Sequence, residues 1–334
     1  MNIFQHLDLP ENHRKSNKVT QLVKHYDDVT EKNKTGKRFA TQIKRDGVCA
    51  LTVISSGAVA IFSRTGNLFT NTAEITEKIE MLNLCDGVYM GEMWVPKSIA
   101  SLEQLSGVVN PNRTKPLGED FNTLPHLLRM SFFDLLNIES FKEGKSSQTF
   151  EDRYHLLLCQ ICKAVEPFGG RHPDIDVLRS AIAEDEAAID IRLTLLIQSG
   201  EEGLVIRDLD ADWEAGHKGY RVMKKVRGVD YDLRCIGYEE GTGKYAGKVA
   251  NLVFDWKGGE TIKCMLGKGW THDMAEEMFN VASYGNNAVV NHVTPKNSPV
   301  GKIFQVYALE ESSKGKLRLA KVGEQRFDKD TADV

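Results

Sequence analysis

Short apolar runs bounded by glycine, serine and charged residues recur through the first two thirds of the chain. Such runs predict β-strands, because strands are short and are flanked by turn residues. Residues 48–54 and 58–63 are joined by Ser55-Ser56-Gly57 and predict a β-hairpin. The other strands that the pattern predicts cover residues 39–43, 87–95, 129–136 and 204–206.

Apolar residues at helical spacing predict helices among these strands. The expected helices cover residues 74–83, 150–165 and 174–198, with a further short helix around residues 19–26. Within the helix at 174–198, the acidic run Glu184-Asp185-Glu186 is interpreted as a solvated face.

Beyond residue 230, apolar runs alternate with glycine turns and include one helix around residues 274–279. The runs cover residues 233–238, 248–255, 261–266 and 302–309. About five short strands with one helix suit a Greek-key barrel of the OB type. A chain of 334 residues is long enough for two domains. We therefore expect an α+β protein, with antiparallel sheets and helices in residues 1–227, a barrel in residues 228–334, and a hinge at residues 227–230.

The composition argues against a membrane protein. A membrane helix needs about 18 consecutive apolar residues, and no run approaches that length. The first eight residues also lack the apolar core of a signal peptide. Six scattered cysteines fit a reducing compartment, so we expect the protein in the cytoplasm, or in the host cytoplasm if it is viral. Cys159 and Cys162 form the only close pair, and we expect both to pack in the core, with a zinc site as the alternative.

Charge is distributed unevenly along the chain. The net charge of −4 argues against a protein that coats DNA indiscriminately. Ten Lys or Arg residues nevertheless lie between residues 12 and 45, and a second basic stretch covers residues 218–234. Such clusters suit contact with a phosphate backbone on one face, and a solvated surface is the alternative interpretation.

The tetrapeptide Lys44-Arg45-Asp46-Gly47 is the strongest candidate for chemistry. It lies between two predicted strands, where a glycine permits close approach of backbone and ligand. A lysine amine in such a place can act as a nucleophile toward phosphorus. The K-x-D-G pattern alone is weak, and an exposed surface lysine is the alternative.

Six further patterns follow the tetrapeptide in order. They are Ser63-Arg64-Thr65-Gly66, Gly91-Glu92-Met93, Phe133-Asp134, Glu202-Gly203-Leu204-Val205-Ile206-Arg207, Lys224-Lys225 and Arg326-Phe327-Asp328-Lys329. The series resembles the ordered motifs of the ATP-dependent DNA ligases of the covalent nucleotidyltransferase superfamily, in their minimal two-domain, phage-like form. The resemblance covers residues 44–329, nearly the whole chain.

The resemblance implies an adenylation (nucleotidyltransferase) domain followed by an OB-fold domain, and it implies roles for single residues. Lys44 would be the catalytic nucleophile that attacks the α-phosphorus of ATP. Glu92 and Glu202 would hold Mg²⁺. Arg45, Arg64, Arg221 and Arg227 would contact DNA. The nucleotide-binding residues would be Lys44, Asp46, Gly47, Arg64, Glu92, Phe133, Glu202, Lys224, Lys225, Arg326 and Lys329, with core packing as the alternative for Phe133.

Three positions depart from the family pattern. The usual D-G-E is Met90-Gly91-Glu92, which removes the first acid and leaves Glu92. The usual K-x-K is replaced by adjacent lysines, so Lys224 and Lys225 both remain candidates. The arginine that ends many K-x-D-G-x-R motifs is Cys49. The contact with the nick phosphate that this arginine is expected to make would fall to another cation, such as Arg64.

The function that the resemblance implies is sealing of nicks between a 5′-phosphate and a 3′-hydroxyl in duplex DNA, in replication and repair. The reaction would pass through a lysyl-adenylate and a DNA-adenylate. We expect a monomer that uses ATP and Mg²⁺ and has nicked duplex DNA as its partner. An RNA ligase or a capping-type guanylyltransferase would use the same lysine chemistry, and a nucleic-acid clamp is the non-enzymatic alternative.

Overall fold

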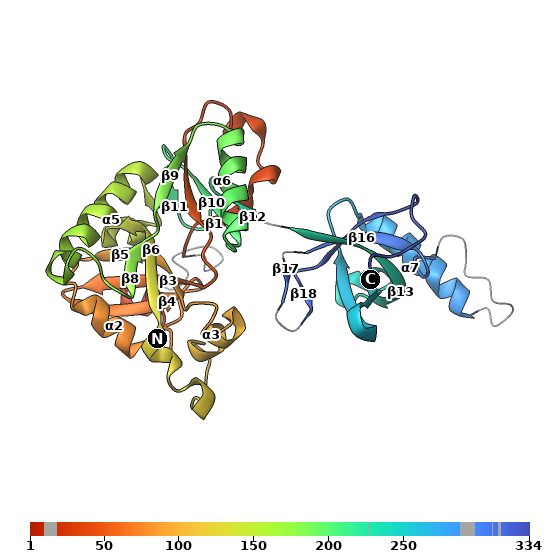
Figure 1. Ribbon diagram of the computed structural model, residues 1–334, viewed down its shortest axis with the longest axis horizontal. Coiled ribbons are helices and arrows are strands. Elements are labelled where there is room, and N and C mark those ends of the chain that lie inside the picture. The colour runs from red at the N-terminus through yellow and green to blue at the C-terminus, as the bar shows by residue number, and fades with distance from the viewer. Residues whose placement is uncertain (10–18, 227, 288–297, 309, 313–314) are drawn as a thin grey trace. The chain divides into compact units, whose positions relative to one another are not determined.

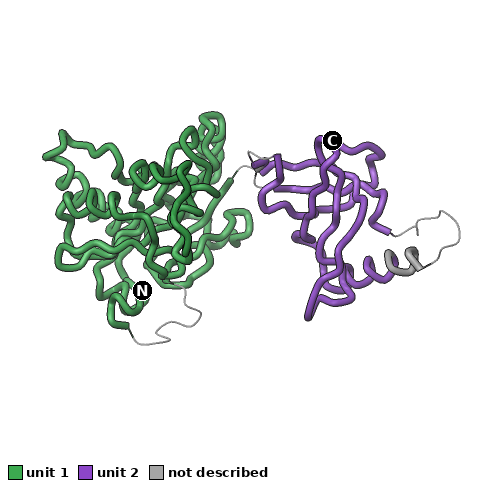
Figure 2. The backbone as a smooth tube through the Cα atoms, turned by 90° about the horizontal axis from the view of Figure 1, so that it is seen from below, with its two compact units in different colours: residues 1–226 green, residues 227–334 purple. Residues whose placement is uncertain are grey.

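The computed structural model describes residues 1–9, 19–226, 228–287, 298–308, 310–312 and 315–334. The chain divides into two compact units, Met1–Val226 and Arg227–Val334 (Figure 2). The first unit contains two five-stranded sheets with helices, and the second contains a closed barrel. In the described residues, no helix combines the length and the apolar character of a membrane span.

The first sheet of unit 1 has the strand order β4-β3-β5-β6-β8 (Figure 1). Adjacent strands in this sheet run antiparallel, except for β6 and β8, which run parallel. The strands are β3 (Val48–Ser55), β4 (Ala58–Ser63), β5 (Gly87–Trp94), β6 (Arg129–Leu136) and β8 (Ile175–Val177).

Both faces of this sheet are covered, and the alternation along β3 shows how. Ala50 and Ile54 belong to the core that includes side chains of α2 (Ala73–Glu80), α3 (Leu102–Val108) and α5 (Phe150–Val165). Leu51 and Val53 point to the other face, where they join a core with α1 (Ile3–His6), α4 (Ile138–Glu143) and Trp213. Successive side chains of a strand point to opposite faces, so a strand buried on both sides is apolar throughout.

The second sheet has the order β1-β12-β10-β2-β9. Its core contains Ile189 of α6 and Tyr26 of the 3₁₀ turn η2. The strands are β1 (Leu22–His25), β2 (Phe39–Ile43), β9 (Ser180–Ala183), β10 (Gly203–Asp208) and β12 (Lys218–Val226), and α6 is Glu186–Gln198. A small ribbon pairs β7 (Lys145–Ser146) with β11 (Trp213–Glu214). The 3₁₀ turns are η2 (Tyr26–Asp28), η3 (Glu31–Asn33), η4 (Glu119–Phe121), η5 (Leu124–Leu127) and η6 (Glu166–Phe168).

The tetrapeptide at residues 44–47 connects the two sheets. It follows β2 of the second sheet and precedes β3 of the first. Residues 178–179 make a second crossing, from β8 to β9. The sheets therefore meet at the tetrapeptide, which is where a ligand can contact strands of both.

Unit 2 is a closed barrel with the order β13-β14-β15-β19-β16. Leu233, Cys235, Leu252, Phe254 and Phe304 fill its interior. The elements are β13 (Val229–Glu240), β14 (Val249–Trp256), β15 (Glu260–Leu266), α7 (His272–Asn287), β16 (Ile303–Ala308), β17 (Glu310–Glu311), β18 (Leu317–Arg318) and β19 (Lys321–Gln325), with the 3₁₀ turns η7 (Gly243–Tyr245) and η8 (Lys257–Gly259). The predicted α+β class with a C-terminal OB-type barrel is confirmed, although the closing strand β19 was not predicted.

Three predictions about local structure are wrong. Residues 174–198 are not one helix, because β8 and β9 pair at the edges of the two sheets and α6 begins only at Glu186. Asp185, expected on a solvated helix face, caps α6 by accepting a hydrogen bond from the Ala188 backbone N–H at 2.7 Å. Residues 22–25 form β1, which pairs in parallel with β12, instead of a helix.

The two cysteines of the close pair lie outside the core. Both Cys159 and Cys162 are exposed, because the buried face of α5 is made by Leu157, Ile161 and Val165. The expectation that they pack in the core is therefore wrong. The six cysteines of the chain, all in described parts of it, are free thiols.

Candidate active site

Lys44 lies at the junction of the two sheets and is held at both ends. Its backbone N–H donates to the Gly203 carbonyl at 2.9 Å. Its side-chain amine donates to Glu202 Oε2 at 2.6 Å, and the Glu202 carboxylate is buried whereas the lysine is partly exposed. Two segments that are far apart in the sequence, the tetrapeptide and the start of β10, thus form one corner.

Gly47 is required by this packing. A Cβ atom at this position would lie 2.6 Å from the Met93 carbonyl oxygen and 2.8 Å from Glu92 Cγ. Both distances are too short for real contacts, so any side chain would push β5 away from the tetrapeptide. Gly47 therefore brings Glu92 close to Lys44.

Glu92 is a half-buried carboxyl group on β5. Burial raises its pKa to about 8, with Lys44 acting to lower the pKa and the Glu202 carboxylate acting to raise it. Among the described residues, no side chain or backbone group makes a hydrogen bond or ion pair with this carboxyl group. A buried carboxyl group needs a partner, so the position suits a ligand or a cation.

Glu92 and Glu202 are suitable ligands for Mg²⁺. Carboxylate oxygens are what this ion prefers, and it commonly binds one or two carboxylates together with substrate phosphates and water. The described residues contain no group of three His, Cys, Asp or Glu side chains that could hold a metal alone. The unpartnered Glu92 carboxyl group beside a second carboxylate fits this incomplete type of site.

The adjacent lysines of β12 point in opposite directions. Lys224 is paired with Val205, a residue of the cavity wall, and burial followed by the nearby Lys44 charge lowers the pKa of Lys224. Lys225 points to the opposite face, where its amine lies 2.5 Å from Asp190 Oδ1 and 3.3 Å from Glu186 Oε1. The structure thus brings Lys224 to Lys44 and directs Lys225 to α6, away from the site.

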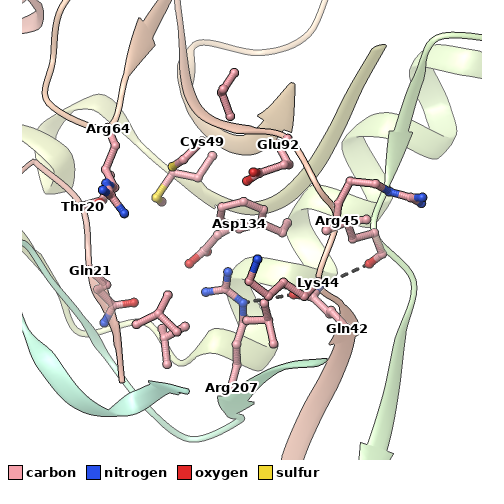
Figure 3. Close-up of a pocket in the computed structure, with 18 of the residues that line it drawn as sticks. Thr20, Gln21, Gln42, Lys44, Arg45, Cys49, Arg64, Glu92, Asp134 and Arg207 are labelled. Atoms are coloured by element: carbon pink, nitrogen blue, oxygen red, sulfur yellow. Dashed lines mark hydrogen bonds between the residues drawn. The ribbon is translucent and has the colours of Figure 1, made fainter. Parts of the chain in front are cut away.

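A cavity of about 490 Å³ opens beside Lys44 (Figure 3). This volume lies in the range of small-molecule sites, roughly 300–1,000 Å³. Arg64, Glu92 and Cys49 border it on one side, and Lys44, Gln42 and Arg207 border it on the other. Polar groups of both signs therefore converge on a pocket that also has apolar walls.

Phe133 lines the cavity, and one of its faces is covered. The Arg207 guanidinium carbon lies 4.5 Å from the centre of the Phe133 ring. Phe133 is only half-buried, so it is not a simple core residue. A base that stacks on this ring would have to use the uncovered face.

Arg207 is a site residue to which the sequence assigned no role. It is 6% exposed, and burial lowers its pKa to about 10 although nearby Asp134 acts in the opposite direction. Its Nε–H donates to Gln42 Oε1 at 3.0 Å. Within the described residues its two terminal nitrogens make no hydrogen bond or ion pair, and they point toward the cavity (Figure 3). Asp134 is not available to it as a partner, because Arg153 binds both Asp134 oxygens at 2.8 and 3.1 Å.

Cys49 and Arg64 lie next to each other on the cavity wall (Figure 3). Burial raises the pKa of Cys49 to about 12, so its thiol stays protonated. In the described residues Arg64 forms no hydrogen bond or ion pair. It is therefore a cation that can bind an anion at the place where the sequence lacks an arginine.

Arg45 and Asp46 border a different, smaller cavity of about 280 Å³. The Arg45 guanidinium carbon lies 4.3 Å from the centre of the Trp94 ring, and its Nη1 lies 3.7 Å from Glu201 Oε1. Asp46 is close enough to Glu92 to raise the pKa of Glu92. Arg45 also lines the main cavity, so it lies between the two, whereas Asp46 lines the smaller cavity beside the corner.

The other basic residues predicted to bind DNA or nucleotide are paired with acidic side chains or lie outside the described residues. Arg221 is paired with Asp212 and Glu214, each at 2.7 Å. Arg227 lies outside the described residues. Arg326 and Lys329 belong to unit 2, where both contact Asp232.

Comparison with known proteins identifies the family. The family model for the ATP dependent DNA ligase domain matches residues 20–226, which is more than half of the chain. The chain belongs to the ATP-dependent DNA ligase family. A second model, for the DNA ligase OB-like domain, matches residues 240–326 of this ligase family member.

Individual relatives agree with the family models. A probable DNA ligase of Streptomyces griseus subsp. griseus is 30% identical over 142 residues, which are 41% of this chain and 25% of the relative. The solved structure named Pmar-Lig_Pre has a TM-score of 0.73 at 21% identity and covers 93% of this chain and 68% of its own. A solved Lig E DNA ligase has a TM-score of 0.64 at 18% identity, over 92% of this chain and 98% of its own. These two likenesses concern the fold, and the chain spans about a quarter of the Streptomyces ligase.

Proposed function

We propose that this chain is an ATP-dependent DNA ligase that seals nicks between a 5′-phosphate and a 3′-hydroxyl in duplex DNA. The observation that carries the proposal is the position of the Lys44 amine, 2.6 Å from Glu202 Oε2 and beside a nucleotide-sized cavity. Glu92 and Lys224 lie around the same amine. A surface lysine would have none of these neighbours.

The first step forms a lysyl-adenylate. The Lys44 nitrogen, after losing a proton, attacks the α-phosphorus of ATP, so that an N–P bond forms and the bond from Pα to the bridging oxygen of the β-phosphate breaks. Pyrophosphate leaves with the electron pair of that bond. Glu202 is at hydrogen-bond distance from the amine, so it can orient the amine and take up its proton.

Nucleotide binding would use the residues of the main cavity. Phe133 offers one ring face to the base, and Arg207 offers two N–H groups without protein partners to acceptor atoms of the nucleotide. Lys224 would place a positive charge near the phosphates. The close packing of Glu92 on Gly47 would keep the Glu92 carboxyl group near Lys44, and Asp46 would lie beside Glu92.

Glu92 and Glu202 would hold Mg²⁺. When bound, the ion neutralises phosphate charge and polarises the phosphorus under attack. The protein supplies the two carboxylates. Lys225 is not included in this proposal, because it is paired with α6.

The later steps transfer AMP to the 5′-phosphate and release it when the 3′-hydroxyl attacks. In the first transfer a P–O bond forms at the adenylate phosphorus while the Lys44 N–P bond breaks. In the last step the 3′-oxygen bonds to the 5′-phosphorus and AMP leaves. Arg64 would contact the nick phosphate in place of the arginine missing at Cys49, with Arg45 and Arg221 as further DNA contacts, and Arg326 and Lys329 would bind the pyrophosphate portion of ATP.

Further parts of the proposal concern the setting of the enzyme. We expect a monomer that acts on nicked duplex DNA in replication and repair. Six free cysteines fit the reducing cytoplasm. The family models favour this function over an RNA ligase, a capping-type guanylyltransferase or a non-catalytic clamp.

The experiment that separates these functions uses labelled nucleotides. The protein is incubated with labelled ATP or labelled GTP and Mg²⁺, and nicked DNA or nicked RNA is then added. A DNA ligase takes label from ATP alone and loses it as DNA is sealed. Label from GTP would contradict the proposal, and so would transfer to RNA without sealing of DNA.

A further inference from the structure

The two basic side chains of the C-terminal segment share one buried carboxylate. Asp232 on β13 accepts hydrogen bonds from Arg326 Nη1 at 3.0 and 3.2 Å, and the Lys329 amine contacts Asp232 Oδ2. The Asp232 side chain is 6% exposed, whereas both cations are partly exposed. One carboxylate therefore holds a guanidinium and an ammonium side by side at the surface of the barrel.

The backbone around Asp232 fastens the same segment. The Asp232 N–H donates to Asp333 Oδ2 at 2.6 Å, and the Asp333 N–H donates to the Asp232 carbonyl at 2.8 Å. Two residues along β13, Arg234 Nη2 donates to the Asp330 carbonyl at 2.6 Å. Residues 326–333 are thus fixed to β13 at several points, and a single strand determines where both cations lie.

The pairing also determines which edge of Arg326 faces outward. Asp232 takes one terminal nitrogen, whereas Nε and the other terminal nitrogen form a two-point contact with Asp328, at 3.0 and 2.8 Å. The Asp328 side chain is 65% exposed. The edge of Arg326 that the exposed Asp328 carboxylate occupies has the geometry that binds a carboxylate or a phosphate through two hydrogen bonds.

We infer that Asp232 is a positioning residue for self-adenylylation, because it fixes Arg326 and Lys329 as a preformed pair for the pyrophosphate portion of ATP. The inference rests on the proposed function, in which these two cations bind that group. Long basic side chains lose rotamer freedom when they bind an anion, and a buried carboxylate that has already ordered them removes part of this loss. The side-chain carboxylate of Asp232 pairs with Arg326 and Lys329, so we expect its effect to be confined to the step that uses polyphosphate.

The test compares two reactions of Asp232→Asn. The first is formation of the lysyl-adenylate from ATP, followed as kcat/KM for ATP. The second is sealing of DNA that already carries AMP at the nick, which needs no ATP. We expect a loss of about 10- to 100-fold in the first reaction, the scale on which misplaced groups impair catalysis, and little change in the second.

Two further variants serve as controls for this test. Asp230→Asn changes an exposed carboxylate two residues earlier on the same strand, and both reactions should stay at the wild-type rate. Asp232→Glu keeps the charge and should recover part of the first reaction. Sealing of preadenylated DNA reports whether the variants are folded.

The outcomes distinguish the inference from the proposed function. If the wild-type protein forms no adenylate, the proposed function is wrong. If the wild type forms adenylate and Asp232→Asn does so at the same rate, the positioning role is wrong. Equal losses in both reactions would show a structural role for Asp232 and would also overturn the inference.

Discussion

Cys49 and Glu92 lie directly opposite each other in the β3–β5 ladder. Side chains at paired positions point to the same face of a sheet, with Cβ atoms about 4.5–5.5 Å apart. The position where many relatives would carry an arginine is therefore next to the candidate metal ligand. With a neutral thiol in that place, burial dominates and the pKa of Glu92 rises to about 8.

Cys49→Arg should consequently change the pH dependence of adenylate formation. Below its pKa the Glu92 carboxyl group is protonated and cannot bind a metal ion, so the rate at limiting Mg²⁺ should increase as the pH rises toward 8. A guanidinium beside Glu92 lowers the pKa, and we expect this increase to occur at a pH lower by about one unit. Rates measured from pH 6 to 9 at limiting Mg²⁺ test this. Cys49→Ala serves as the control, and an equal shift in that variant would contradict the explanation.

Glu92→Gln should alter the pH dependence of stability. The pKa of Glu92 is about 8 in the folded protein against an ordinary value of 4.5, so the stability that its protonated form contributes is complete below pH 4.5 and is lost as the pH rises through 8. Glutamine avoids this loss. Thermal unfolding without metal should therefore show a gain for the variant at pH 9 relative to pH 5, with each kcal/mol of that gain raising Tm by about 2–4 °C in a domain of this size. The same difference from wild type at both pH values would show that the carboxyl group is not buried in the protonated form.

Lys224 and Lys225 form a matched pair for mutation. Lys224→Ala should reduce adenylate formation by about 100-fold or more, since Lys224 is the lysine near Lys44. Lys225→Ala removes an ion pair with α6 and should leave the rate close to that of the wild type. Single-turnover adenylate formation measures both variants, and a larger loss for Lys225→Ala would reverse the assignment.

Arg64→Ala should impair sealing of preadenylated DNA more than adenylate formation. A hydrogen-bonded contact between Arg64 and the nick phosphate would be worth about 1.5–3 kcal/mol, or roughly 10- to 100-fold. Arg171→Ala, at an exposed arginine of the same unit, is the control. If Arg64→Ala lost both activities equally, the assignment of Arg64 to the nick phosphate would be wrong.

The sequence could predict the parts of the site that depend on which residues are neighbours along the chain. Lys44 follows an apolar run and stands three residues before Gly47, and Glu202 stands next to Gly203 just before an apolar run, so a strand-edge position followed from the residues alone. The choice between Lys224 and Lys225 could not be predicted, because it depends on which face of β12 meets the cavity. That orientation comes from the pairing of Val205 with Lys224, which is a tertiary relationship.

The missed features have similar causes. Arg207 directly follows the strand predicted at residues 204–206, where an arginine is ordinarily a surface residue, and its burial follows from packing against Phe133 and Gln42. Residues 175–183 contain short apolar runs that suit a helix as well as a strand, and pairing with β6 and β2 decides between them. Gly47 was predicted to allow close approach, and the short distances from a Cβ atom at that position to Met93 and Glu92 give the physical reason.

The central claim is that the Lys44 amine carries adenylate during the reaction. Intact mass spectrometry after mixing the protein with ATP and Mg²⁺ tests it most directly. We predict that the wild-type protein gains the mass of one AMP, that Lys44→Ala gains none, and that pyrophosphate removes the adduct from the wild type. An adduct that persists in Lys44→Ala, or a wild-type protein that stays unmodified under these conditions, would contradict the account.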